Sequence, residues 1–184
     1  MFNLNRKSFK KFDYILLLTV LLLCIYGLVM IRSATLSKET LSFVKTQAVA
    51  TVLGFFCILI LVLMDYEFLG KLYIPIYVVC NLLLIAVLIF GFGEDQWGAR
   101  SWLRIGPVRF QPSEFVKIGL IISLAKFIDN NKEDLNEPFT LLKVLAFAFF
   151  PVALILLQPD FGTAVVYVFF IAAMLFIAGI RWKY

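Results

Sequence analysis

Long apolar runs without a charged residue constrain the fold of this chain more than any other feature. The clearest cover residues 14–31, 46–64, 72–93, 144–158 and 161–180. A helix of roughly 20 apolar residues crosses the hydrocarbon core of a bilayer. Most of these runs lack the polar face, recurring every 3.6 residues, that a soluble helix needs. The sequence therefore predicts an all-α, polytopic membrane helical bundle.

The expected membrane-spanning helices number six and form one domain over residues 1–184. The fourth span is the least apolar, because it carries Glu114, Lys117 and Lys126. The longest polar interruption is the loop 93–111, which separates the third span from the fourth. The predicted spans cover approximately residues 13–32, 45–64, 72–92, 112–128, 141–158 and 161–180.

Basic residues ahead of the first span predict the orientation in the membrane. Arg6, Lys7, Lys10 and Lys11 precede it directly, and positively charged flanks stay on the cytoplasmic side. We therefore expect a cytoplasmic N-terminus, with the loop 93–111 on the outer side.

Composition excludes several classes of function. The chain contains no histidine, which excludes His general bases, Ser-His triads and His-ligated metals. Cys24, Cys57 and Cys80 each lie alone within a predicted span, so we expect packing residues and not a disulfide or zinc site. The net charge of +5 does not indicate nucleic-acid binding, because the basic residues lie at span ends and in short loops.

The loop 93–111 gathers cationic and aromatic side chains. It contains Arg100, Arg104, Arg109 and the indoles of Trp97 and Trp102. A guanidinium can bond two phosphate oxygens at once. The indoles can stack on a sugar ring or belong to the aromatic belt at the membrane surface. We expect an anionic ligand at this loop.

Two ionisable residues lie in the first turns of the helix that follows. Pro112 suits the first turn because it needs no amide partner there. Glu114 is near the positive end of the helix dipole, and Lys117, three residues on, projects from the same face. Such groups in a span normally face protein or a watery cavity. The pair either locks neighbouring helices or lies on the wall of a substrate cavity.

A Gln-Pro turn occurs twice, first as Gln111-Pro112-Ser113 and again as Gln158-Pro159-Asp160. Pro159 is expected to end the fifth span, and Asp160 can cap the amides that open the sixth. Gly162 is expected to permit close backbone approach. Alternating topology places both turns on the outer side, although helix punctuation alone would also explain them.

These motifs closely resemble those of the SEDS family (shape, elongation, division and sporulation), which includes RodA and FtsW. The resemblance extends over essentially the whole chain, and residues 151–163 look more like the RodA branch. The stretches that carry it are Gly98-Ala-Arg-Ser-Trp102, Gln111-Pro-Ser-Glu-Phe-Val-Lys117, Gln158-Pro-Asp-Phe-Gly-Thr-Ala164 and Ala178-Gly-Ile-Arg-Trp-Lys-Tyr184.

The resemblance implies a protein of the bacterial cell membrane with about ten spans and both termini in the cytoplasm. It implies polymerisation of lipid II, the undecaprenyl-pyrophosphate-linked disaccharide peptide, into peptidoglycan during elongation and shape maintenance. The implied partners are a class B penicillin-binding protein and other membrane proteins of the elongation complex. The family's proposed catalytic Asp follows the seventh span, so this chain is expected to be the N-terminal portion, to contain no catalytic residue and to be inactive alone.

Roles for individual residues follow from the resemblance and the local chemistry. Lys117 is expected to stabilise the departing phosphate, with Glu114 holding it in position. A divalent cation, Mg or Mn, is plausible for the pyrophosphate, although the sequence offers no clear carboxylate cluster. The expected substrate-binding residues are Arg100, Trp102, Arg104, Arg109, Glu114 and Lys117. The expected motif residues are Gln111, Pro112, Ser113, Gln158, Pro159, Asp160, Gly162 and Thr163.

Two other functions stay open. Broken helices and buried charge pairs also occur in transporters, so the chain could flip a lipid-linked precursor across the membrane. It could also be a scaffold of the elongation or division machinery without chemistry of its own. The cationic and aromatic residues collect on one side only, which favours chemistry at the membrane surface over alternating access.

Overall fold

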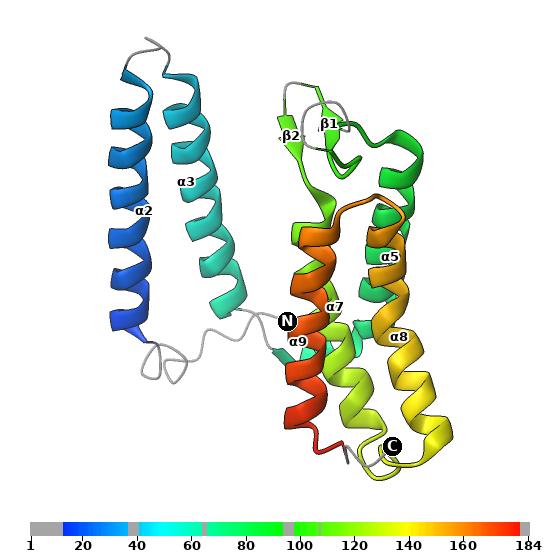
Figure 1. Cartoon of the computed structure of the whole chain (residues 1–184). Helices are drawn as coiled ribbons and strands as arrows, with labels where there is room; N and C mark the ends of the chain where they lie inside the picture. Colours follow the sequence, from blue (N-terminus) through cyan, green and yellow to red (C-terminus); the bar gives the residue numbers. More distant parts are fainter. Residues whose placement is uncertain (1–12, 37–40, 64–65, 94–97, 107, 181–184) are drawn as a thin grey trace. The chain divides into compact units, whose positions relative to one another are not determined.

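The computed structural model describes residues 13–36, 41–63, 66–93, 98–106 and 108–180. These residues are mostly helical, as predicted (Figure 1). The chain divides into two compact units, Met1–Phe68 and Leu69–Tyr184, which are described separately. The helices are α2 (Tyr14–Ala34), α3 (Ser42–Leu63), α4 (Tyr66–Lys71), α5 (Tyr73–Phe90), α7 (Pro112–Asn130), α8 (Pro138–Leu156) and α9 (Phe161–Ile177), and the strands are β1 (Leu103–Ile105) and β2 (Val108–Phe110).

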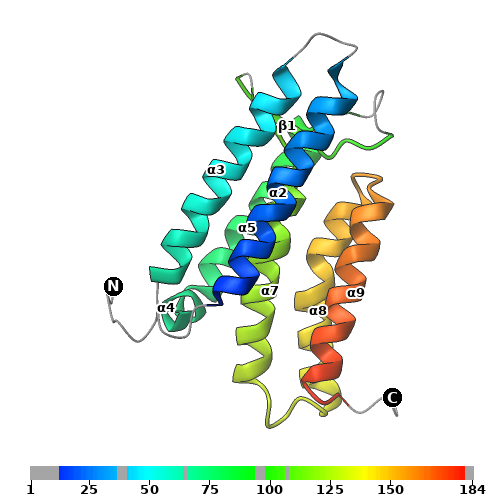
Figure 2. The same cartoon turned by 90° about the vertical axis from the view of Figure 1, so that its left-hand side faces the viewer.

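The first unit contains the antiparallel helices α2 and α3, which lie side by side (Figure 2). Neither helix buries a residue, and both are apolar on every face. Their hydroxyl groups bond back to their own helix, as when Thr51 donates to the Gln47 carbonyl at 2.8 Å. A helix that is apolar all round is suited to lipid and not to water.

Four helices of the described chain, α2, α3, α5 and α8, are long and apolar enough to cross a membrane. α9 is apolar but shorter, with 17 residues, and α7 carries both acidic and basic side chains. The prediction of a multi-pass helical membrane protein is confirmed. Six spans in a single domain remain a prediction.

The second unit packs α5, α7, α8 and α9 around one apolar core, with α7 in contact with the other three (Figures 1 and 2). Successive helices run in opposite directions, so the end of α5, the start of α7, the end of α8 and the start of α9 meet at one end. The β1–β2 hairpin lies there too, and we name it the hairpin end. Fully buried side chains of the core include Leu84, Leu120, Val144, Ile155 and Ile171.

α5 and α7 approach closely at Gly119. A Cβ atom there would overlap the sulfur of buried Cys80 and lie 3.2 Å from the Cγ2 atom of Ile76. Small residues allow membrane helices to pack backbone to backbone in this way. The interpretation of the cysteines as packing residues is right for Cys80, whereas Cys57 is exposed on α3.

Pro151 lies inside α8 and has no amide hydrogen to donate to the Phe147 carbonyl one turn earlier. The Tyr77 hydroxyl of α5 donates to that carbonyl at 2.9 Å. The Tyr77 ring also stacks on Phe147, with centroids 3.8 Å apart, and Phe127 of α7 stacks on Phe147 at 4.4 Å. A neighbouring helix thus supplies the donor that proline removes, which is how membrane proteins tolerate proline inside a helix.

The loop between α5 and α7 contains an antiparallel hairpin that the sequence analysis did not predict. β1 pairs with β2 in the register Leu103↔Phe110, Arg104↔Arg109 and Ile105↔Val108. Phe92 and Trp102 exchange backbone hydrogen bonds of 3.0 and 3.3 Å beside β1. Strands of three residues are too short for a reliable pattern of alternating polarity.

Replacing Tyr77 by Phe is expected to destabilise the chain by about 1 kcal/mol, because the Phe147 carbonyl loses its donor while the stacked ring stays. In a Pro151→Ala background the same replacement should have less effect, since alanine at that position restores the helical amide. Reversible unfolding in mixed micelles measures both. Tyr26→Phe, at an exposed position of α2, is the matched control. An equal loss of stability in both backgrounds would contradict this role of Tyr77.

Candidate functional site

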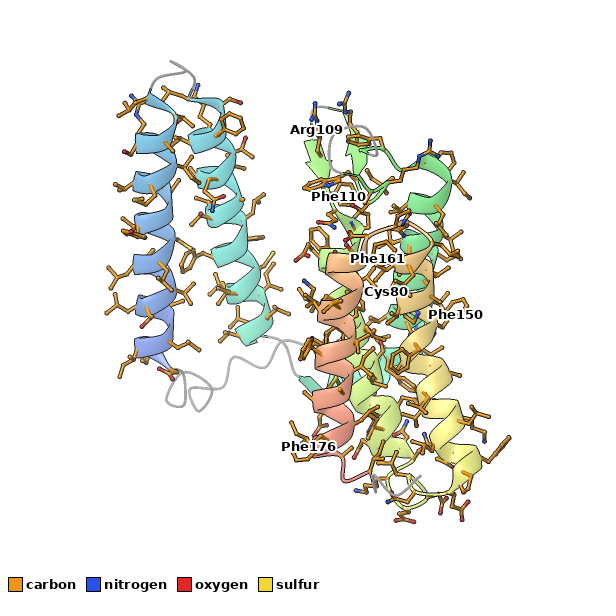
Figure 3. The ribbon with its side chains drawn as sticks, viewed as in Figure 1. Cys80, Arg109, Phe110, Phe150, Phe161 and Phe176 are labelled. Carbon is orange, nitrogen blue, oxygen red and sulfur yellow. The ribbon has the colours of Figure 1, made fainter. Side chains whose placement is uncertain are left out.

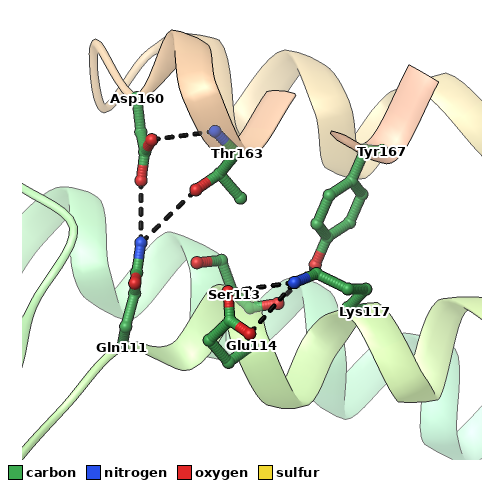
Figure 4. A network of polar contacts seen from close by, with 7 residues as sticks. All are labelled: Gln111, Ser113, Glu114, Lys117, Asp160, Thr163 and Tyr167. Atoms are coloured by element: carbon green, nitrogen blue, oxygen red, sulfur yellow. Dashed lines mark hydrogen bonds and ion pairs between the residues drawn. The ribbon is translucent and has the colours of Figure 1, made fainter. Parts of the chain in front are cut away.

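An ion pair lies on the first turns of α7 at the hairpin end. The Lys117 Nζ atom donates to both carboxylate oxygens of Glu114, each at 3.0 Å (Figure 4). The Glu114 side chain is 58% exposed and that of Lys117 is 26% exposed. The prediction that both project from one face is confirmed. The pair joins two positions of the same helix; locking of neighbouring helices and a place on a cavity wall both stay predictions.

A buried tyrosine holds the turn that carries this pair. The Tyr167 hydroxyl of α9 donates to the Ser113 carbonyl at 2.6 Å (Figure 4). Ser113 is itself buried, and its hydroxyl has no hydrogen-bond partner in the described part of the chain. Tyr167 was not among the residues predicted from the sequence. One feature of the sequence could have identified this residue. Tyr167 carries the only hydroxyl in the apolar run that follows Thr163.

A second set of polar contacts joins the start of α7 to the start of α9. The Gln111 Nε2 atom donates to Asp160 Oδ2 at 2.9 Å and to Thr163 Oγ1 at 3.4 Å. The other Asp160 oxygen accepts the backbone N–H of Thr163 at 3.1 Å, which caps α9 (Figure 4). The capping role of Asp160 and the common side of the two Gln-Pro turns are therefore both confirmed. We call Gln111, Asp160 and Thr163 the clasp.

The remaining motif residues serve the fold. Pro112 opens α7 as predicted, and α8 ends at Leu156, ahead of Pro159. Gln158 is buried and donates to the Leu84 carbonyl of α5 at 3.2 Å. The expectation for Gly162 is wrong, because an added Cβ would meet no described atom within 4 Å.

The arginines lie on the hairpin and on the segment that leads into it. Arg104 and Arg109 are exposed and directly opposite each other on β1 and β2. Their Cζ atoms lie 5.1 and 6.0 Å from the centroid of the Phe92 ring. Arg100 is also exposed, and Trp102 is half-buried where it pairs with Phe92. Trp97 lies outside the described residues.

The hairpin is attached to α7 through an aromatic contact. Phe110, at the end of β2, meets Phe115 edge to face with ring centroids 6.1 Å apart. Figure 3 shows Arg109 at the far end of the hairpin, Phe110 closer to the helices, and Phe161 at the start of α9. The arginines and the Glu114–Lys117 pair therefore share one end of the second unit. Charge stabilisation of an anion is the chemistry that this end can provide.

The acidic and thiol side chains of the described residues are dispersed. No three Asp, Glu, Cys or His side chains in the described ranges gather closely enough to hold a metal ion. Asp160 is committed to the clasp and Glu114 to Lys117. A cation for the pyrophosphate stays a prediction.

Comparison with known proteins gives consistent results. A family model for FtsW, RodA and SpoVE, described as cell cycle protein, matches residues 13–184. Over 169 residues the chain is 35% identical to the probable peptidoglycan glycosyltransferase FtsW of Legionella pneumophila, in a match that covers 88% of this chain and 43% of the relative.

Two solved structures are similar to the chain. That of the rod shape determining protein RodA of Thermus thermophilus gives a TM-score of 0.81 at 32% identity, covering 94% of this chain and 56% of that one. A structure described as coordinating polymerization and crosslinking by a peptidoglycan synthase complex gives 0.82 at 31% identity, covering 94% and 49%. The chain spans about half the length of the relatives it matches.

The clasp predicts a specific coupling between Gln111 and Asp160. Gln111→Glu should destabilise the chain by about 1 kcal/mol, because a second carboxylate replaces the donor beside Asp160. The loss should be smaller in an Asp160→Asn background, where the repulsion is absent and the Asn amide can donate to the introduced carboxylate. Unfolding free energies of the four proteins in micelles give the coupling. Additive losses would show that the two side chains do not interact.

Proposed function

The chain belongs to the FtsW/RodA/SpoVE family, and we propose that the protein is a peptidoglycan glycosyltransferase that polymerises lipid II into glycan strands. The observation that carries the proposal is the ion pair of Glu114 and Lys117, placed beside an arginine-bearing hairpin at one end of an apolar bundle. Relatives of this chain are named probable peptidoglycan glycosyltransferases, which supports the same reaction here.

The reaction needs positive charge where the lipid pyrophosphate departs and a base for the acceptor hydroxyl. Lys117 supplies the charge, and Glu114 keeps its ammonium in one place through two hydrogen bonds. Tyr167 and the clasp hold the turn from which both project. No described residue is assigned as the base.

We place the hairpin end at the outer surface of the bacterial cell membrane. Basic residues before α2 support a cytoplasmic N-terminus. Three successive spans, α2, α3 and α5, then bring the chain to the outer side before the hairpin. The pyrophosphate of a lipid-linked precursor lies at a bilayer surface, so this position and the proposed substrate agree.

A class B penicillin-binding protein is the proposed partner. Support comes from the similar structure whose description joins polymerization to crosslinking in one complex. A role in elongation remains a prediction, because the reported sequence relative is an FtsW whereas the reported single-protein structure is a RodA. Membership of the elongation complex is likewise a prediction.

A precursor flippase is less well supported. In the second unit the charged and hydrogen-bonded site residues gather at the hairpin end. An alternating-access transporter places its site near the bilayer midplane. Deeper in the second unit, the Tyr77 hydroxyl and the Asn81 Nδ2 atom each donate to a backbone carbonyl, whereas the buried Asn81 Oδ1 atom has no partner among the described residues. A scaffold without chemistry would not require the exposed pair.

The test uses a chimera in which residues 13–184 replace the matched part of Thermus thermophilus RodA, reconstituted with its transpeptidase and labelled lipid II. Lys117→Met should reduce polymerisation by about a hundredfold, because the departing phosphate loses a charge. Lys126→Met is the matched control. It removes a lysine of the same helix that is also paired, to Asp129 at 2.8 Å, at the opposite end.

Equal polymer from the Lys117→Met and parent chimeras would contradict the role of Lys117. A folded parent chimera that moves lipid II across vesicles without making polymer would instead support the flippase.

A further inference from the structure

We propose that Arg104, Arg109 and Phe92 form a clamp that captures a lipid-borne anion with two phosphate charges. This clamp deepens the proposed function. The choice of ligand rests on that function, because the proposed substrate carries the pyrophosphate of a polyprenyl lipid. The clamp is a site of first capture. Bond breaking belongs to the Lys117 turn.

The register of the hairpin places two like charges opposite each other. Arg104 and Arg109 are cross-strand partners, and directly opposite residues project from the same face of a ladder with their Cβ atoms about 5 Å apart. Like charges in this arrangement are destabilising. Neither arginine forms an ion pair with a carboxylate of the described chain. A bound dianion would convert this repulsion into two attractions.

Phe92 fixes the two guanidinium groups. Both Cζ atoms lie within 6.0 Å of its ring centroid, a distance at which a guanidinium is attracted to an aromatic face. The Phe92 backbone is in turn held by its two hydrogen bonds with Trp102. Because both guanidinium groups already lie over one ring in the absence of ligand, we expect less side-chain entropy to be lost on binding. Each guanidinium presents a planar fork of donors that can bond two phosphate oxygens.

The surroundings favour an anion attached to a lipid over a soluble one. The hairpin connects directly to α7 through the contact of Phe110 with Phe115. Phe115 and Ile118 on α7 are each 59% exposed, so an apolar surface continues from the hairpin along the helix. A ligand with a phosphate head and a hydrocarbon tail would contact both the clamp and this surface.

Charge compensation distinguishes the clamp from Lys117. The Lys117 ammonium is bonded to both oxygens of Glu114, so its charge is already balanced in the absence of ligand. The charges of Arg104 and Arg109 are not balanced by a described carboxylate. An approaching anion is therefore attracted first by the hairpin.

The test measures binding and stability in parallel on the 184-residue chain in phosphatidylcholine nanodiscs. Arg104→Ala and Arg109→Ala should each weaken the binding of polyprenyl pyrophosphate about tenfold. Without ligand, each variant should be at least as stable as the parent, because the repulsion is relieved. Phe92→Leu should weaken binding less. Arg32→Ala, which removes an exposed arginine at the end of α2, is the charge-matched control and should bind like the parent.

Three ligands identify the source of the phosphate. Polyprenyl pyrophosphate bound more tightly than phosphatidylglycerol and inorganic pyrophosphate supports the proposal as stated. Equal binding of phosphatidylglycerol, still dependent on both arginines, would overturn the preference for two phosphate charges and assign the arginines to bulk anionic lipid. Binding that is unchanged in both variants, or variants that lose stability in proportion to binding, would overturn the clamp.

The clamp and the glycosyltransferase activity can be refuted independently of each other. Binding through the arginines without polymerisation by the chimera refutes the glycosyltransferase and leaves the clamp. Polymerisation that survives both arginine substitutions at low lipid II concentration refutes the clamp and leaves the enzyme.

Discussion

Hydrogen bonds from side chains to backbone carbonyls of neighbouring helices hold the second unit in register. Tyr77, Ser123, Gln158 and Tyr167 each donate to a carbonyl of another helix. In an apolar environment a polar atom without a partner is strongly unfavourable, so each bond restricts the sliding or rotation of one helix against the next. The bond from Tyr167 restricts the position of α7 at the hairpin end, because its acceptor, the Ser113 carbonyl, directly precedes Glu114.

The hairpin end contains charges in two electrostatic states. Glu114 and Lys117 neutralise each other within one helix, whereas Arg104 and Arg109 oppose each other without a described counter-charge. The first arrangement holds a cation in a defined place. The second is the arrangement that we propose to attract an anion. Capture and charge stabilisation of one lipid-linked pyrophosphate would use both, in that order.

Much of the site could be predicted from the sequence because its geometry is local. The pairing of Glu114 with Lys117, the cap by Asp160 and the position of Pro112 follow from spacing along one helix. The clasp was predicted only as a common side for two turns, because the choice of Gln111 as partner depends on helix packing. Gly162 was misjudged, since its surroundings are not a local property.

The apolar runs by themselves determined that this chain forms membrane helices, because uninterrupted apolar runs of about 20 residues match the length of a helix that crosses a bilayer and satisfies its own backbone. Three ordered motifs carried the resemblance to the family, which the family model then showed. Only the tertiary structure decided that Tyr167 supports the Lys117 turn, that Tyr77 replaces the donor lost at Pro151, and that Arg104 faces Arg109 across a hairpin. Each of these depends on contact between residues from different elements, and a one-dimensional pattern does not specify how helices rotate or where a short strand finds its partner.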